Sequence, residues 1–110
     1  MERIESSYQA GVAAAEHDIA TGRPRLRYGA IGAWGEDLAR TLQVRFGVEL
    51  VVLPCLTSAA QLSFDAGHND TIEPHIDGIH GPGSVEAVWE EIQRHRKEAY
   101  DAWVAEQKPT

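Results

Sequence analysis

"RLRYGAIGAWGEDLARTLQVRFGVELVVLP" (residues 25–54) contains a strand-like run, a helix-like run and a second strand-like run. Residues 25–29 predict a short strand, weakly supported by Tyr28 and one polar–apolar alternation. Residues 36–46 predict a helix, with acids in its first turn and a glycine after its last. Residues 48–54 are almost continuously apolar, which is typical of a strand covered on both faces. This order, with short connections, predicts a right-handed crossover between two parallel strands.

Helices are predicted on both sides of this unit. Residues 2–21 carry apolar side chains at three- and four-residue steps, as an amphipathic helix does. A middle helix is predicted from about residue 58 to residue 70, with Thr57 or Ser58 as its cap. Because Pro74 would kink a helix interior, a break is expected there, followed by a short helix up to residue 80 that Thr71 caps.

The final helix is predicted over residues 85–106, with Ser84 as its cap. The expected fold is therefore α/β, with a small two-stranded parallel βαβ core packed with N-terminal, middle and long C-terminal helices. The chain of 110 residues is long enough for one domain, residues 1–110, with residues 105–110 as a frayed tail.

Composition restricts the classes of partner and compartment. The chain has 10 basic and 17 acidic side chains, a formal net charge of −7, which argues against nucleic acid and anionic membranes as partners. No apolar run is long enough to span a bilayer, and the first ten residues do not resemble a signal peptide. The single cysteine fits a reducing compartment, so a cytoplasmic location is expected.

The glycine-rich turn after the first strand is interpreted as a corner and not as a nucleotide site. A dinucleotide fingerprint needs three glycines in the pattern GxGxxG, but Ala30 stands in place of the first glycine. The second strand ends without an acid to bind a ribose, and no Lys-Ser or Lys-Thr pair follows the glycines. Glu36 and Asp37 at the start of the next helix would repel a phosphate. No cofactor is therefore predicted.

The lone cysteine lies where a parallel sheet commonly binds ligands, after the second strand and before a helix. A helix N-terminus lowers the pKa of a thiol, so Cys55 is a candidate nucleophile with His68 as its base. The alternative is a small buried, inert side chain. If the strand ends converge, the candidate site comprises catalytic Cys55 and His68 with ligand-binding Tyr28, Trp34, Thr57 and Asn69.

Two further features have a structural and a functional interpretation. Asn69 lies on an apolar stripe, where its amide could hold a neighbouring backbone segment or point into a ligand pocket. Glu73, Asp77 and His80 share one helix face and could bind a divalent metal. They match no helical metal motif, so an acidic solvated face is favoured and no metal is predicted.

The final helix and the small sheet both indicate self-association. Trp89 and Trp103 lie two heptads apart on one side of the helix, and a two-stranded sheet alone is a poor domain. We therefore expect a non-enzymatic homodimeric interaction module that binds a protein or a small molecule. The alternative is a thiol-dependent enzyme or redox protein that uses Cys55.

Overall fold

The computed structural model describes residues 4–29, 35–53 and 58–107. Its elements follow in the order α1 (Glu5–Ala20), β1 (Arg25–Gly29), α2 (Gly35–Phe46), β2 (Glu49–Leu53), α3 (Ala59–His80) and α4 (Ser84–Gln107). The two strands pair in parallel and form a two-stranded sheet, with Arg25 opposite Glu49 and Gly29 opposite Leu53. The predicted α/β fold with a βαβ core and a long C-terminal helix is confirmed.

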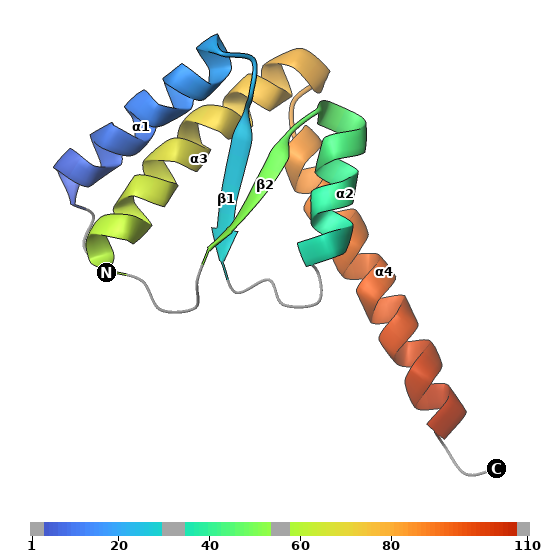
Figure 1. Cartoon of the computed structure of the whole chain (residues 1–110). Coiled ribbons are helices and arrows are strands. Elements are labelled where there is room, and N and C mark those ends of the chain that lie inside the picture. Colours follow the sequence, from blue (N-terminus) through green and yellow to red (C-terminus); the bar gives the residue numbers. More distant parts are fainter. Residues whose placement is uncertain (1–3, 30–34, 54–57, 108–110) are drawn as a thin grey trace.

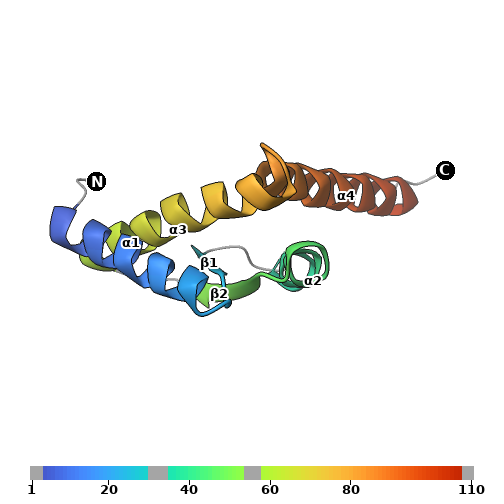
Figure 2. The same ribbon diagram turned by 90° about the horizontal axis from the view of Figure 1, so that it is seen from above.

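The helices surround the sheet unequally. Figure 1 shows the two strands between α1 and α2, with α3 running beside β1 and α4 extending past α2. In the perpendicular view of Figure 2, α3 and α4 form one side of the molecule and β2 lies on the opposite side. Helix α3 packs on β1 and helix α2 packs on β2, and β2 lies away from α3 and α4.

The hydrophobic core joins α1, β1, α2, the residue before β2, the second half of α3 and the first half of α4. Its members share near-complete burial and come from every one of these elements: Ala15, Leu26, Leu38, Leu42, Val48, Ile72, Ile76, Val85, Val88 and Ile92. Leu38 and Leu42 lie one turn apart on α2, as the apolar stripe of that helix requires. The crossover helix is thereby fixed against the sheet.

Helices α1 and α3 pack at backbone contact because glycines stand at their crossing. A Cβ atom built on Gly11 would lie 2.0 Å from the carbonyl oxygen of Phe64. A Cβ atom built on Gly67 would lie 2.1 Å from the carbonyl oxygen of Tyr8. Any larger residue at either position would push the helices apart.

The predicted break in the middle helical region is wrong, because α3 is a single helix of 22 residues with Pro74 inside it. Proline removes one amide donor from a helix, but Pro74 faces solvent, where water can satisfy the carbonyl that loses its partner. Its neighbours Ile72 and Ile76 are buried in the core on the opposite side. Tertiary packing therefore outweighs the local preference for a break.

The capping residue predicted from the sequence is observed at the start of α3 but not at the start of α4. Ser58 caps α3 as predicted, because its Oγ accepts a hydrogen bond from the amide of Gln61 at 3.1 Å. At the start of α4, the carboxylate of Asp77 accepts from the amides of Gly83 and Val85, each at 3.3 Å. The expected cap Ser84 is instead the first residue of α4, so the predicted capping residue is wrong.

The second half of α4 projects from the rest of the molecule (Figure 1). Ile92 is the last buried residue of α4, and the remaining residues 93–107 are here named the arm. The radius of gyration is 16.4 Å, whereas a compact chain of this length would have about 13 Å. Across the described ranges, no helix combines the length and apolarity that crossing a membrane demands.

Candidate functional site

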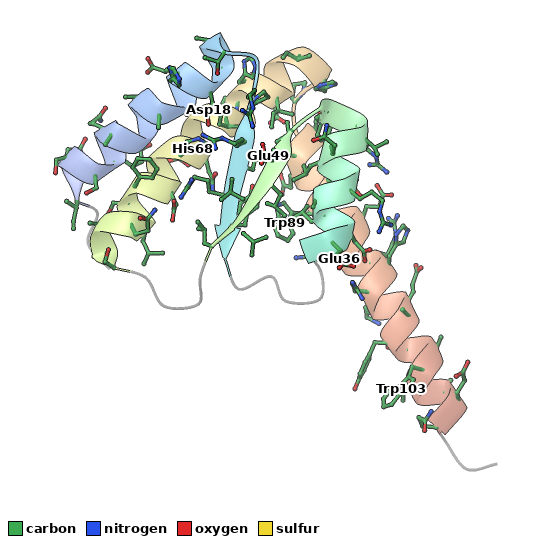
Figure 3. All side chains as sticks on the ribbon, viewed as in Figure 1. Asp18, Glu36, Glu49, His68, Trp89 and Trp103 are labelled. Carbon is green, nitrogen blue, oxygen red and sulfur yellow. The ribbon has the colours of Figure 1, made fainter. Side chains whose placement is uncertain are left out.

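Asp18 and His68 form a buried pair between α1 and α3 (Figure 3). His68 is 1% exposed, and its Nε2 lies 2.8 Å from Oδ2 of Asp18. The same carboxylate accepts two hydrogen bonds from the guanidinium of Arg25, at 2.9 and 3.1 Å. Burial opposes ionisation of Asp18, but the hydrogen bonds from Arg25 and His68 outweigh it and hold its pKa below the usual range. Together with Arg25, the pair therefore joins α1, α3 and β1.

The position of His68 does not suit a base for an exposed thiol. Its other ring nitrogen, Nδ1, is also buried and has no hydrogen-bond partner among the residues that the structure describes. The ring stacks on Phe64 at a centroid distance of 6.4 Å. Cys55, Trp34 and Thr57 lie outside the described residues, so the predicted catalytic pair stays a prediction.

Asn69 holds the edge of β1 with both ends of its amide. Its Oδ1 accepts from the backbone amide of Arg27 at 2.9 Å, and its Nδ2 donates to the carbonyl of Arg27 at 2.7 Å. A single side chain thus supplies the two hydrogen bonds that a third strand would make at this residue. Of the two interpretations of Asn69, the geometry supports the structural one.

Tyr28 lies on the other side of β1, against α3 and α4. Its hydroxyl donates a hydrogen bond to Oε1 of Glu73, and its ring meets Trp89 edge-on at a centroid distance of 5.1 Å. Burial and the contact with Glu73 raise the pKa of Tyr28 well above its usual value, so the phenol stays protonated. Tyr28, His68 and Asn69 therefore serve three different contacts.

The three candidate metal ligands on α3 are also directed to separate partners. Glu73 accepts from Tyr28, Asp77 caps α4, and His80 packs on Phe46 with ring centroids 4.7 Å apart. Within the ranges that the structure describes, no three His, Cys, Asp or Glu residues are grouped as a metal site would require.

Sequence reasoning missed the ionic contacts that β1 makes with α1 and α3. Arg27 pairs with the buried Asp65 at 2.6 Å, and its guanidinium lies 5.4 Å from the ring centroid of Phe64. The sequence did contain a signal for these contacts. Arg25 and Arg27 are two residues apart and so lie on the same face of the strand, and acidic residues fall inside two of the helices. These contacts fix helices to the strand and have the character of structural ion pairs.

The arm carries a shallow hollow and two strongly exposed aromatic side chains. A shallow groove of about 640 Å³ runs along it and is lined by Gln93, Arg96, Lys97, Ala99, Tyr100 and Trp103. Tyr100 is 64% exposed and Trp103 is 57% exposed, with ring centroids 6.2 Å apart. Figure 3 shows Trp103 near the end of α4, far from His68 and Asp18.

Comparison with protein-family models, curated proteins and solved structures gives no significant match.

Proposed function

We propose that the chain is a non-enzymatic homodimeric interaction module whose two copies associate through the arm. The observation that carries this proposal is the exposed pair Tyr100 and Trp103 on a helix that leaves the body of the protein. Trp103 belongs to the same stripe as Trp89, but Trp89 packs against the core and Trp103 does not. Tryptophan and tyrosine are the residues that most often anchor protein interfaces.

The length of the arm supports the need for a partner. It has fifteen residues, and a helix of that length is marginally stable in water unless one side is packed. Contacts within the arm include the exposed ion pair between Lys97 and Asp101, 2.7 Å apart, and the ring contact between Tyr100 and Trp103, and solvent screens such an exposed ion pair. Packing of the stripe against a second copy would supply the missing stabilisation.

The charges and sizes of the side chains along the stripe favour an antiparallel arrangement. Arg96, Ala99, Trp103 and Glu106 follow alternating steps of three and four residues, as the inward positions of a coiled coil do. Antiparallel pairing centred on Asp101 sets Arg96 against the partner subunit's Glu106. It also sets Ala99 against the partner subunit's Trp103, a small side chain against a large one. Parallel pairing would instead oppose two Arg96 side chains, which repel.

Two features of the sequence agree with a binding role in the cytoplasm. The single cysteine fits a reducing compartment, and the absence of a catalytic motif in the sequence favours a module without chemistry of its own. The partner of such a module is a protein or a small molecule. The alternative, a thiol-dependent enzyme or redox protein using Cys55, has no support from His68, which is buried against Asp18.

The test is the mass of the protein in solution, measured by light scattering and native mass spectrometry across the micromolar range. We expect a dimer for the wild type and a monomer for Trp103→Ala, because loss of an interface tryptophan costs about 2 kcal/mol or more, roughly a 30-fold rise in Kd. Val44→Ala is the matched control, since Val44 is 78% exposed on α2 and lies outside the arm.

A charge exchange tests the antiparallel register. Glu106→Arg should weaken the dimer by opposing two arginines, and the double variant Arg96→Glu with Glu106→Arg should restore it. Because Arg96 also pairs with Asp37 at 2.8 Å, circular dichroism must show that each variant is folded. A monomeric wild type, or a Trp103→Ala protein that dimerises equally well, would refute the proposal.

A further inference from the structure

The two edges of the sheet are not equivalent, and the hydrogen-bond pattern shows why. In a parallel ladder, the amide and carbonyl of one residue face the same neighbour, and successive residues alternate between the two sides. The amide of Glu49 donates to the carbonyl of Pro24 at 3.2 Å, so Glu49 faces β1. Val51 and Leu53 therefore face β1 as well, and Leu50 and Val52 direct their main-chain groups away from it.

The outward main-chain groups of Leu50 and Val52 form an open edge. No hydrogen bond joins these four groups to any residue in the described parts of the chain. At the opposite edge, Asn69 occupies both outward groups of Arg27. Figure 2 shows β2 on the side of the molecule away from α3 and α4. The sheet therefore has one closed edge and one open edge.

The side chains along the open edge are apolar and lack the usual protection of exposed edge strands. Such strands commonly carry lysine, proline or a bulge, which discourage pairing with other chains. Here the sequence is ELVVL, and its one charged residue, Glu49, is at the first position, 3.6 Å from Arg23. Val52 is 62% exposed, so an apolar surface accompanies the free main-chain groups.

We propose that the outer edge of β2 binds an extended segment of a partner protein, which adds to the sheet as a third strand. An extended backbone can pair with the donor and the acceptor of Leu50 and of Val52 at the same time, as in strand addition to a sheet edge. The net charge of −7 and the position of Glu49 favour a segment without acidic residues and with β-branched side chains.

The choice of a partner segment over a second copy rests on the proposed pairing of the arms. If the arms already join two copies, a second self-contact at β2 would link dimers into larger assemblies. A partner segment leaves the dimer closed and gives it two equivalent binding edges. The binding of the segment itself does not require the arm.

Val52→Pro tests the edge without breaking the sheet. Proline removes only the amide of residue 52, which points outward, and the exposed side chain contributes little to the core. Val52→Thr is the matched control, because it keeps that amide and is also β-branched. The probe is a capped synthetic peptide, KVTVTVK, whose binding is followed by calorimetry and by amide hydrogen exchange.

We expect the amides of Leu50 and Val52 to exchange quickly in the free protein and to become protected when the peptide binds. Val52→Pro should weaken binding by about tenfold, and Val52→Thr by less than about threefold. Methylation of the peptide amides on one edge should abolish binding, whereas methylation on the other edge should not.

Three results would overturn the inference. The first is that the peptide does not bind at millimolar concentration. The second is that Val52→Pro and Val52→Thr bind the peptide equally well. The third is that the Val52→Pro protein forms a smaller assembly in solution than the wild type does. The last result would mean that a second copy occupies the edge. Peptide binding by a monomeric Trp103→Ala protein would separate this inference from the proposed function. It would show that the β2 edge binds a strand even when the arms do not pair.

Discussion

Replacing Gly11 with alanine tests whether α1 and α3 must touch through their backbones. The added Cβ would lie 2.0 Å from the Phe64 carbonyl oxygen, whereas ordinary contact begins at 3.4 Å, so the helices must separate by about 1.4 Å. The obstacle is backbone inside a helix and cannot rotate away. Overpacking of this kind costs about 3 kcal/mol, against a gain of about 1 kcal/mol from the better helix propensity of alanine. We expect a net loss of about 2 kcal/mol.

Gly78→Ala is the control, because it makes the same change in α3 with no heavy atom within 4 Å of the new Cβ. It should raise the free energy of unfolding by up to about 1 kcal/mol through propensity alone. Urea denaturation followed by circular dichroism measures both variants, and Gly11→Ala should also lower Tm by about 10 °C. A Gly11→Ala protein as stable as wild type would show that the helices do not need this close contact.

Three further predictions concern Asn69, Asp18 and Pro74. Asn69→Leu should lower the free energy of unfolding by about 2 kcal/mol or more in urea denaturation, because both outward groups of Arg27 lose their partner; an unchanged midpoint would contradict the role assigned to Asn69. Since the folded-state pKa of Asp18 is lowered, its contribution is complete above the unfolded value of about 4 and is lost as pH falls through the folded pKa. Stability should therefore decline below about pH 4, and less steeply in Asp18→Asn; equal slopes in acid denaturation would argue against this. Pro74→Ala should raise Tm, because it restores an amide donor inside α3; a lower Tm would mean that the proline shapes the helix.

The sequence predicted the α/β class and most of the elements, because the second strand and the crossover helix have clear patterns even though the first strand was only weakly supported. The apolar run before Pro54 and the leucine stripe of α2 each match one kind of structure, and the crossover rule then requires parallel strands. The break near Pro74 was wrong because a local penalty was weighed without the burial of Ile72 and Ile76, which only the folded core supplies.

The candidate site was predictable only in part. The position of Asn69 on an apolar stripe indicated an amide that holds a backbone segment, and in the structure this partly buried side chain binds both main-chain groups of Arg27. The pair of His68 and Asp18 joins residues 50 positions apart on different helices, and no local pattern indicates such a contact. The helical glycines Gly11 and Gly67 were a usable signal, because a glycine inside a helix often marks close approach of another backbone.

The side-chain amide of Asn69 also controls how the protein can aggregate. Unlimited head-to-tail stacking of sheets needs the β2 edge of one molecule to pair with the β1 edge of the next. Because Asn69 already occupies the outward groups of Arg27, the β1 edge cannot accept an incoming strand there. A chain that displays one unprotected strand thereby lacks the complementary edge from which a fibril could grow.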